Sequence, residues 1–362
     1  MDKKNIFKSA IGVQEGIDRP HGINPDFLSE SGRKKRKNLS VEEYTNGIIS
    51  GNRIILSQAI TLIESSLSKH YDTAQSIIEK CLPYSSRSVR IGITGAPGAG
   101  KSTLIEAFGL HITGLGRKLA VLTIDPSSEQ TRGSILGDKT RMEQLSVHPN
   151  AFIRPSPSAG TLGGVARKTR EAIVLCEAAG FDTIIVETVG VGQSETAVHS
   201  MVDFFLLLML AGAGDEIQGI KRGIMEMADL IAITKADGAN EINAEQARIL
   251  FQNALHLFPA SSSGWKPGVL VSSARTKKGI AELWEIISEY VDFTTKSGYF
   301  ESFRKKQAIL RMHDTILEQL NYSFYNHEDV KLLLPELEKK LSDDKITSYK
   351  AALNLLDKYF GR

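Results

Sequence analysis

The stretch VRIGITGAPGAGKST, residues 89–103, decides the fold of this chain. It begins with an apolar run and continues with the pattern G-x-x-x-x-G-K-S, which is fixed by Gly95, Gly100, Lys101 and Ser102. Glycines let the backbone curl so that successive N–H groups point at phosphate oxygens, and a helix beginning near Lys101 adds the positive end of its dipole. A strand before this pattern and a helix after it are typical of a P-loop, so we expect a phosphate-binding loop here.

The whole loop supplies candidate nucleotide contacts: Gly95, Ala96, Pro97, Gly98, Ala99, Gly100, Lys101, Ser102 and Thr103. We expect Lys101 to reach the β and γ phosphates and Ser102 to offer its hydroxyl to Mg²⁺. Pro97 has no N–H, but a loop position that does not face phosphate can accept it. A glycine-rich turn with a chance Lys-Ser pair is the alternative, and the complete pattern in the right context argues against it.

Further apolar runs extend the pattern on both sides of this loop. The candidate strands are 89–94, 119–125, 182–188, 203–210, 230–234 and 268–272. Most are continuously apolar and do not alternate, which is typical of strands covered on both faces. Because helical stretches lie between them, we predict an α/β fold: a P-loop NTPase with a mostly parallel sheet flanked by helices.

The chain divides into four segments. Residues 1–40 are polar and basic, which predicts a solvated arm, with a docking tail as the alternative. Residues 41–87 have apolar side chains at helical spacing and predict an N-terminal helical extension. The P-loop domain is expected over 88–292. Residues 293–362 are charged and helical, with an apolar stripe that packs on its own domain or forms a dimer seam.

Composition limits the partners and the compartment. The 362 residues are 41% hydrophobic and carry a formal net charge of +2, too even a balance to favour nucleic acid or a membrane surface as a partner. Cys81 and Cys176 have no paired spacing, which favours reduced thiols. The N-terminus has no apolar signal region, and the longest apolar run, 204–211, is far shorter than the ~20 residues of a membrane span. We therefore expect a cytoplasmic protein.

Three acidic residues are candidates for the metal and catalytic site. Asp125 ends the strand 119–125, where it can hold Mg²⁺ directly or through water, or merely cap a turn. Asp138 lies in a loop, and its assignment to the metal is equally open. Glu187 ends the strand 182–188 at the Walker B position, and Gly190 then permits close approach to the γ phosphate. We predict Lys101, Asp125 and Glu187 as catalytic, and Ser102, Asp125, Asp138 and Glu187 as magnesium ligands.

Two short motifs after the later strands predict a guanine pocket. In TKAD, residues 234–237, Asp237 can accept two hydrogen bonds from the N1–H and N2–H₂ edge of guanine, a donor pair that adenine lacks. The stem of Lys235 can lie over the base, while Thr234 stands where the related NKxD motif has Asn. VSSA, residues 271–274, matches the loop that covers the guanine oxygen. The predicted base contacts are Thr234, Lys235, Ala236, Asp237, Ser272, Ser273 and Ala274.

Longer segments resemble one family. GAPGAGKST, IDPSS, GSILGDKTRM, SAGTLGGVA, ETVGVGQSE and AGAGDEIQGIKRG together resemble the methylmalonyl-CoA mutase-associated GTPases, or ArgK-type proteins, a P-loop class with Glu at the Walker B position. The resemblance implies a GTPase that uses GTP, GDP and Mg²⁺. It also implies assistance to an adenosylcobalamin-dependent acyl-CoA mutase, mainly methylmalonyl-CoA mutase, by gating cofactor loading and protecting the holoenzyme. Family members are typically homodimers joined through a C-terminal helical extension.

The resemblance further identifies the segment 211–223 as a switch that relays the nucleotide state to the mutase. Its charged residues are Asp215, Glu216, Lys221 and Arg222, which could exchange partners between two loop positions. From the residues alone, an ordinary charged loop is the favoured alternative. Val191, where many GTPases have a water-orienting Gln, cannot orient water, and Gln193 follows two residues later. We expect slow intrinsic hydrolysis that a bound partner accelerates.

Three other functions stay open. A metallochaperone GTPase for nickel enzymes needs clustered soft or imidazole ligands, whereas the eight histidines here are scattered. A P-loop kinase acting on a small molecule or a protein is disfavoured by TKAD, although several arginines precede the Walker B strand: Arg132, Arg141, Arg154, Arg167 and Arg170. A scaffold with a vestigial site is disfavoured by the intact Lys101, Ser102 and Glu187.

Overall fold

The computed structural model describes residues 39–65, 67–125, 142–157, 162–188, 194–211 and 222–361. The chain divides between Ser40 and Val41, and the elements described here belong to the part that begins at Val41. The arm expected over residues 1–40 lies almost wholly outside the described residues.

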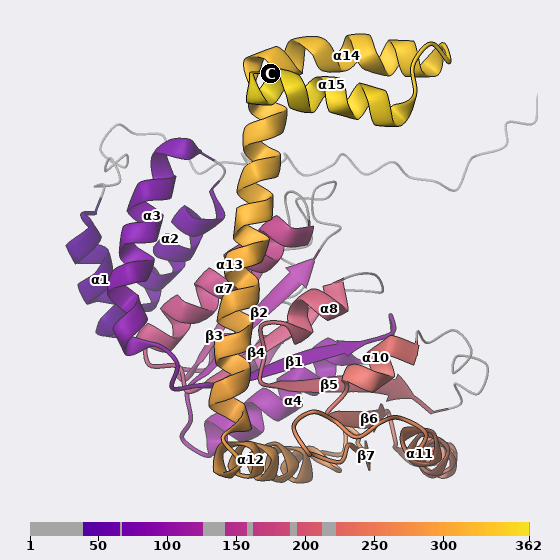
Figure 1. Cartoon of the computed structure of the whole chain (residues 1–362). Coiled ribbons are helices and arrows are strands. Elements are labelled where there is room, and N and C mark those ends of the chain that lie inside the picture. Colours follow the sequence, from indigo (N-terminus) through magenta and orange to yellow (C-terminus); the bar gives the residue numbers. More distant parts are fainter. Residues whose placement is uncertain are drawn as a thin grey trace, which may run out of the picture. The chain divides into compact units, whose positions relative to one another are not determined.

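A seven-stranded sheet forms the centre of this unit (Figure 1). Its strands are β1 Val89–Gly95, β2 Leu119–Asp125, β3 Ala151–Pro157, β4 Thr183–Thr188, β5 Phe204–Leu210, β6 Leu230–Thr234 and β7 Gly268–Val271. They lie in the order β3-β2-β4-β1-β5-β6-β7, and every pairing is parallel. The predicted α/β fold is confirmed, with a sheet that is parallel throughout.

The register of the sheet positions the functional site. Ile93 of β1 pairs with Glu187 of β4 on one side and with Leu206 of β5 on the other. The ends of these three strands therefore lie next to one another at one edge of the sheet. In parallel α/β sheets, ligands bind at this edge, outside the carboxyl ends of the strands.

Strand β3 is the one strand that the apolar runs did not predict. Its sequence is AFIRPSP, and proline inside a run argues against a strand because it cannot donate to the ladder. β3 lies at the end of the strand order, so only one of its sides pairs with another strand. Proline is tolerated at such an edge.

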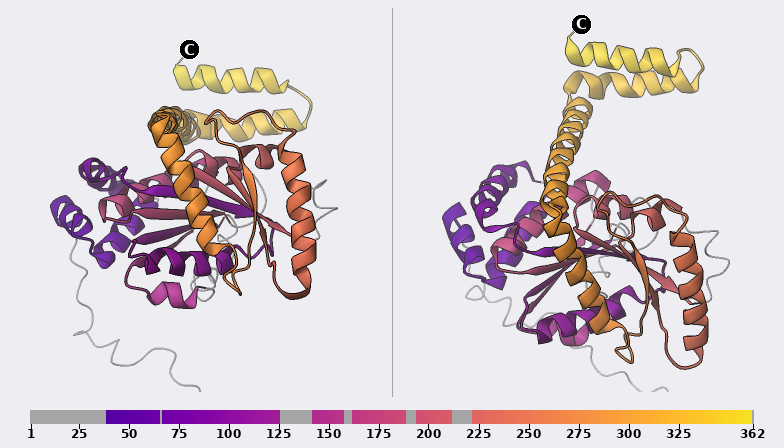
Figure 2. Two further views of the ribbon diagram at one scale, coloured as in Figure 1. Left: turned by 90° about the horizontal axis from the view of Figure 1, so that it is seen from below. Right: turned by 60° about the horizontal axis from the view of Figure 1, so that its bottom comes forward.

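Helices cover both faces of the sheet, as Figure 2 shows. One face is covered by α7 Leu162–Ala178, α8 Ser194–His199, α10 Arg222–Met227 and α11 Glu241–Leu255, and the other by α4 Lys101–Gly114, α6 Glu143–Val147 and α12 Ile280–Lys296. Successive side chains of a strand point to opposite faces. Phe204, Leu206 and Leu208 of β5 accordingly join the core with α4 and α12, while Leu207 and Met209 join the core with α11. This two-sided burial explains the continuous apolar runs.

Three α-helices of the described part precede strand β1. They are α1 Val41–Ile49, α2 Arg53–Glu64 and α3 Ser68–Cys81, and they pack against one another and on α7. Ile48, Leu56 and Ile60 are fully buried in this layer. Asn52 caps α2 by accepting hydrogen bonds from the backbone N–H groups of Ile54 and Ile55.

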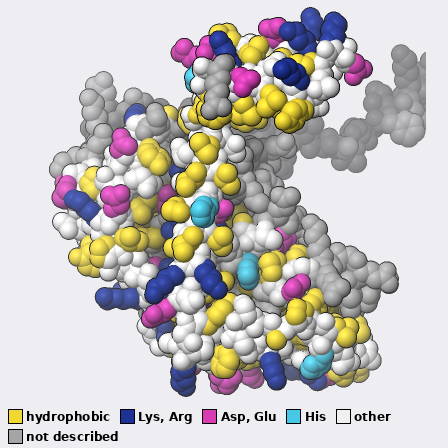
Figure 3. Space-filling model, viewed as in Figure 1, with side chains coloured by type: hydrophobic (Ala, Val, Ile, Leu, Met, Phe, Trp, Pro, Cys, Tyr) yellow, Lys and Arg dark blue, Asp and Glu magenta, His cyan; other side chains and the backbone are white. Residues whose placement is uncertain are grey.

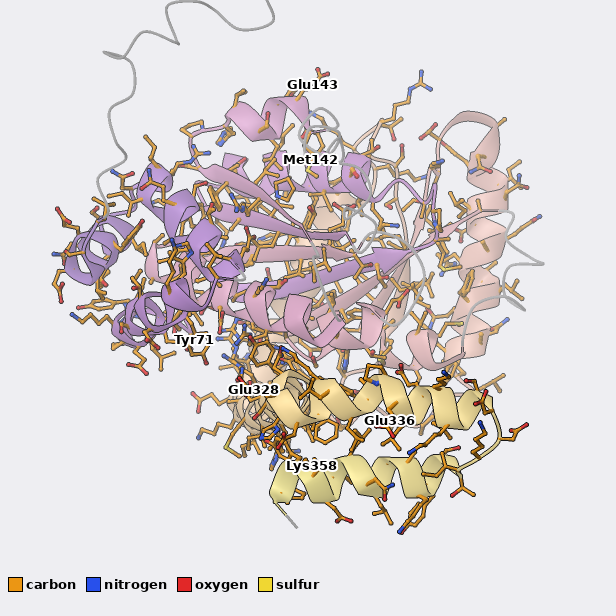
Figure 4. The ribbon with its side chains drawn as sticks, turned by 90° about the horizontal axis from the view of Figure 1, so that it is seen from above. Tyr71, Met142, Glu143, Glu328, Glu336 and Lys358 are labelled. Atoms are coloured by element: carbon orange, nitrogen blue, oxygen red, sulfur yellow. The ribbon has the colours of Figure 1, made fainter. Side chains whose placement is uncertain are left out.

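The C-terminal segment is also helical. It comprises α13 Tyr299–Asn326, α14 Glu328–Ser342 and α15 Ser348–Phe360. α12 runs to Lys296, so the boundary predicted at 292/293 falls inside a helix. α13 packs on α7 and α12, while α14 and α15 pack on each other through Val330, Leu337, Ala351 and Leu355. Figure 4 labels Glu328 and Glu336 on α14 and Lys358 on α15.

No helix in the described ranges is long and apolar enough to cross a membrane. Residues 204–210 of the longest apolar run form the interior strand β5, and Cys81 and Cys176 are buried free thiols.

Candidate functional site

The loop between β1 and α4 has the backbone that its glycines predict. A Cβ on Gly95 would lie 2.6 Å from the carbonyl oxygen of Leu208 on β5, closer than two such atoms can approach. Gly100 caps α4 in the left-handed region, with φ +83°. Ala96 is half-buried, while Pro97 and Gly98 are exposed and Ala99 is buried under the loop. The loop therefore presents its backbone outward at the N-terminus of a helix.

Lys101 lies inside the curve of this loop. Its Nζ donates to the carbonyl oxygens of Gly95 at 2.7 Å and Ala96 at 3.2 Å. Burial lowers the pKa of the Lys101 ammonium, while the carboxylates of Glu187 and Glu195 raise it in part. The ammonium is thus held where a phosphate would meet the loop N–H groups.

Ser102 and Glu187 meet beside this lysine. The Ser102 hydroxyl donates to Glu187 Oε1 at 3.3 Å, and Glu187 is 3% exposed at the end of β4. Next to them, the hydroxyl of Thr188 donates to Thr94 Oγ1 at 2.9 Å and joins β4 to β1. A hydroxyl and a carboxylate at this spacing form an oxygen donor set that suits Mg²⁺ when phosphate oxygens and water complete its coordination.

The described ranges contain no group of three or more His, Cys, Asp or Glu side chains placed to hold a metal ion. A hard cation here would therefore depend on Ser102, Glu187 and the phosphates of the nucleotide, as in other P-loop proteins. The predicted ligand Asp125 ends β2, but its side chain lies outside the described part, as does all of Asp138.

Glu195 is a site residue that the sequence reasoning missed. It lies in the first turn of α8, is 3% exposed and acts electrostatically on Lys101. An acid in the first turn of a helix is favoured by the helix dipole. In the sequence, Glu195 could have been identified by its position directly after GQS, eight residues beyond Glu187.

Thr234 connects the predicted base pocket to the phosphate loop. Its hydroxyl donates to the Ala99 carbonyl at 2.7 Å and approaches the Met209 carbonyl at 3.1 Å. The Thr234 side chain is buried, so water could not replace its hydroxyl as the hydrogen-bond donor to these two carbonyls. Threonine thus makes at this position a contact that fastens the β6 end to the P-loop.

Asp237 is fixed by the second base-pocket segment. Ser273 Oγ donates to Asp237 Oδ2 at 2.5 Å and in turn accepts from the Thr276 N–H at 3.2 Å. The two segments are also joined by backbone, because Ala236 N–H donates to the Ser272 carbonyl at 3.1 Å. A carboxylate held in this way is oriented to accept hydrogen bonds from a base.

Lys235 lies exposed between these two parts. It has a positive φ of 56°, and its Cε is 3.8 Å from the position that a Cβ on Gly100 would occupy. The stem therefore passes close to the phosphate loop, on the side of the predicted base. Thr103 is exposed on α4 and Ala274 is half-buried after Ser273.

The structure thus brings the P-loop, Glu187 and both base-pocket segments to one edge of the sheet. The structure does not place the side chains of the predicted switch residues. Gly190, Gln193, Asp215, Glu216 and Lys221 lie outside the described residues, and of Arg222 only the backbone, at the start of α10, is described. Their roles stay predictions.

Comparison with known proteins identifies relatives along most of the chain. The family model described as "Methylmalonyl Co-A mutase-associated GTPase MeaB" matches residues 56–329. "GTPase ArgK" of Escherichia coli is 46% identical over 84% of this chain and 89% of its own length. The mouse protein "Methylmalonic aciduria type A homolog, mitochondrial" is 42% identical over 91% of this chain and 82% of its own length.

A solved structure gives the same result for the fold. The structure described as "Crystal structure of LAO/AO transport system kinase" superimposes with a TM-score of 0.70 at 36% identity. The match covers 88% of this chain and 96% of that one.

Proposed function

This chain belongs to the methylmalonyl Co-A mutase-associated GTPase family, and we propose that it serves an adenosylcobalamin-dependent acyl-CoA mutase as a GTP-driven chaperone. It is an enzyme that hydrolyses GTP, like the relatives and the family that are named as GTPases. Methylmalonyl-CoA mutase is the first candidate client, since the family is named for it. In this proposal the nucleotide state gates cofactor loading and protects the loaded mutase.

The observation that carries the proposal is a chain of contacts from the nucleotide edge to α13. α8 begins seven residues after Glu187, and the turn that follows it contains Ser200 and Val202. Arg170 Nη2 donates to Ser200 Oγ at 2.6 Å, and Gln307 Nε2 of α13 donates to the Val202 carbonyl at 2.7 Å. A shift of α8 with nucleotide state would therefore reach α13 through hydrogen bonds that have two discrete states, made or broken.

At the nucleotide edge each residue has a distinct role in the proposal. Lys101 and the loop N–H groups bind and orient the phosphates, while Asp237 selects guanine. Ser102 and Glu187 would hold Mg²⁺, which when bound supplies charge stabilisation at the phosphates. Asp125, Asp138 and Gly190 remain predicted members of the same site. The carboxylates of Glu187 and Glu195 partly offset the burial that lowers the pKa of Lys101.

We also propose that α13 joins two copies of the chain. Apolar side chains stand exposed along this helix at helical spacings: Ile309, Leu310, Met312, Ile316, Leu317 and Leu320. Figure 3 shows this apolar stripe on the outer side of α13. A continuous exposed stripe of large apolar residues marks a protein interface more often than a solvated surface. Its repeat along a single long helix suits an isologous contact with the same helix of a second copy.

A kinase is the second candidate function, because the solved relative is described as a transport system kinase. Phosphate transfer from ATP or GTP to an acceptor would require a substrate hydroxyl or carboxylate at the γ phosphate. TKAD favours guanine, so GTP hydrolysis with water as the acceptor is the simpler expectation.

The test is a measurement of GTP hydrolysis by the purified chain, with and without adenosylcobalamin-dependent methylmalonyl-CoA mutase. ATP serves as the nucleotide control and Lys101→Ala as the inactive control. We expect a slow, GTP-specific rate that the mutase raises. Turnover of several GTP per second by the chain alone would contradict the partner-completed switch, and transfer of phosphate to an acceptor would favour the kinase.

A matched pair of variants on α13 tests the proposed coupling. Gln307→Ala removes the hydrogen bond to the Val202 carbonyl, whereas Lys306→Ala changes the exposed neighbouring residue. We expect Gln307→Ala to keep the basal rate and lose most of the stimulation by mutase, and Lys306→Ala to keep both. Equal stimulation of the two variants would overturn the proposed route.

A further inference from the structure

A cavity lies at the edge of the sheet where the strands begin, opposite the nucleotide site. Asp203 and Asp229, which directly precede β5 and β6, line it. Its other walls come from α8, α10, α12, the first turns of α13 and the segment between α11 and β7 (Figure 1). The volume is about 440 Å³. Small-molecule sites typically have about 300–1,000 Å³, so this cavity is large enough for an organic ligand.

Aromatic side chains form much of the wall. Tyr299 and Phe303 of α13 stack on each other, with ring centroids 5.4 Å apart and an angle of 14° between the rings. The ring of His199, at the end of α8, lies 6.2 Å from that of Phe303 and 5.5 Å from that of Phe205. Tyr290 of α12 completes this group. The faces of such rings attract cations.

The charged side chains on the wall are acidic. They are Asp203, Glu226 and Asp229, and the described residues that line the cavity include neither lysine nor arginine. Asp203 is already balanced, because Arg304 donates to both of its oxygens. Within the described ranges neither Glu226 nor Asp229 has an ion pair. Two acids of the wall are therefore left without a balancing cation.

Asp229 and His199 both keep hydrogen-bonding capacity. Asp229 Oδ2 accepts from the Phe205 N–H at 2.8 Å, whereas the described part of the chain provides no donor to Oδ1. His199 is half-buried, and its ring nitrogens make no hydrogen bond within the same ranges. Burial lowers the pKa of His199, which favours the neutral imidazole with one acceptor nitrogen. Two acceptors thus line an aromatic cavity and have no donor of their own.

We propose that this cavity binds a small organic cation, an ammonium group on an aromatic or aliphatic body. The ammonium would donate to Asp229 Oδ1 and to His199, and the body would pack on Tyr299 and Phe303. Hydrogen bonds between an ammonium and a carboxylate are among the stronger ones, and aromatic faces add to them. An anion is disfavoured, because the charged groups of the wall are acids.

The cavity also joins two elements of the coupling route. His199 and Val202 belong to the end of α8 and the turn after it, while Tyr299 and Phe303 lie near the start of α13. The same two elements are connected by the hydrogen bond from Gln307 to the Val202 carbonyl. A bound cation would hold them together. The inference does not rest on the proposed chaperone function, because it depends only on the walls of the cavity.

The test is a calorimetric titration of the full chain with phenethylamine. Saturating GDP and Mg²⁺ are present throughout, so that the nucleotide site is occupied. Phenethyl alcohol and phenylacetate carry the same ring with no charge and with a negative charge. We expect saturable binding of the amine, binding of the alcohol that is weaker by at least about tenfold, and no binding of phenylacetate. Equal affinities for amine and alcohol, or no saturable binding of the amine, would overturn the proposal.

Trp265 reports whether the amine binds in this cavity. Its ring centroid lies 5.4 Å from that of Tyr290, and its Nε1 donates to the Asp229 carbonyl at 3.1 Å. The chain has two tryptophans, so Trp284→Phe leaves Trp265 as the only one. Its fluorescence should change along the same curve as the heat of binding. Unchanged fluorescence at saturating amine would place the amine elsewhere and contradict the site.

Two variants with the same loss of charge locate the ammonium. Asp229→Asn keeps an oxygen for the Phe205 N–H and should weaken binding of phenethylamine by at least about tenfold. Asp344→Asn changes an exposed acid between α14 and α15 and should bind the amine as the wild type does. Wild-type affinity in Asp229→Asn would also overturn the proposal.

The pH dependence of the wild type covers the case in which Asp229→Asn does not fold. Burial, and then the charge of Asp203, raise the pKa of Asp229 to about 7. The carboxylate therefore gains its charge between about pH 6 and 8, where an alkylammonium keeps its proton. Affinity for phenethylamine should rise over this range, and affinity for phenethyl alcohol should stay constant. An amine affinity that falls or stays level would contradict the site. The other titratable groups of the wall are Asp203, which is paired with Arg304, Glu226, His199, Tyr290 and Tyr299.

Discussion

The two edges of the sheet are built from different interactions. Where the strands end, contacts come from glycine backbone and short hydroxyl side chains, such as Ser102 on Glu187. Where the strands begin, buried ion pairs join distant segments: Arg90 with Glu177 at 2.9 Å, and Arg304 with Asp203 at 2.5 Å. The first kind of contact can reorganise around a ligand at little cost, whereas the second is expensive to break. We call the edge at the strand ends the responding edge, because its contacts can rearrange when a ligand binds. We call the edge at the strand beginnings the holding edge, because its buried ion pairs stabilise the fold.

The largest effect is expected at the holding edge. Glu177→Gln would leave Arg90 buried with an uncompensated charge, and it would weaken the contacts to Ser86 N–H and Ser88 Oγ. We expect the free energy of unfolding to fall by about 3–5 kcal/mol in urea titrations. Glu245→Gln, in the exposed pair with Arg248, is the control and should be close to neutral. Equal losses in both variants would erase the distinction between the edges.

At the responding edge we expect a large loss of activity with little loss of stability. Lys101→Ala removes the ammonium inside the phosphate loop, and we expect the rate of GTP hydrolysis to fall by about 10²–10³. The unfolding free energy should change little, because the hydrogen bonds of Lys101 are to loop carbonyls that can turn to water. Single-turnover hydrolysis and urea unfolding of the same preparation measure both quantities. A loss of stability as large as that of Glu177→Gln would break the comparison.

Substitution of Thr234 shows whether a contact at the responding edge also stabilises the fold. Thr234→Val keeps the shape but leaves the buried Ala99 and Met209 carbonyls without the hydroxyl. We expect a loss of about 1–3 kcal/mol in unfolding free energy and a weaker affinity for GDP. Thr234→Ser retains the donor and should recover most of both. GDP titration by calorimetry separates the two variants, and identical affinities would assign Thr234 a packing role only.

The last effect depends on pH and concerns Asp229, before β6 at the holding edge. Removal from water raises the pKa of Asp229 to about 7, with the nearby Asp203 adding to the rise and the hydrogen bond from Phe205 N–H opposing it. Since the folded pKa exceeds the unfolded value, the folded chain favours the neutral acid. Its contribution to stability is full below about pH 4 and is lost as pH rises toward 7, with a slope of at most about 1.4 kcal/mol per pH unit.

Asp229→Asn should remove this pH dependence while keeping an oxygen to accept the Phe205 N–H. Urea unfolding at a series of pH values from 5 to 8 measures the slope for wild type and variant. Asp344→Asn, at an exposed position between α14 and α15, serves as the control. An unchanged slope in Asp229→Asn would show that another group titrates.

The same comparison explains what the sequence predicts and what it does not. The P-loop, Glu187 and TKAD were predicted because each motif is contiguous and its spacing reports local backbone geometry. The link from Thr234 to Ala99 spans 135 residues, and the pair of Arg90 and Glu177 spans 87, so no local pattern announces them. Glu195 was missed for the related reason that one acid in a helix turn is common. Helical periodicity predicted α13, but not which of its charges would face the core.

Strand β3 has a consequence for how this protein behaves at high concentration. The Ala151 carbonyl accepts from Arg53 Nη2, so the odd-numbered residues of β3 turn their backbone groups away from β2. Pro155 and Pro157 are odd-numbered too, so this open side lacks the two N–H donors that a further strand would use. Unpaired strand edges are templates for aggregation, and prolines there protect against it. Growth of the sheet from one molecule into the next is therefore blocked at β3.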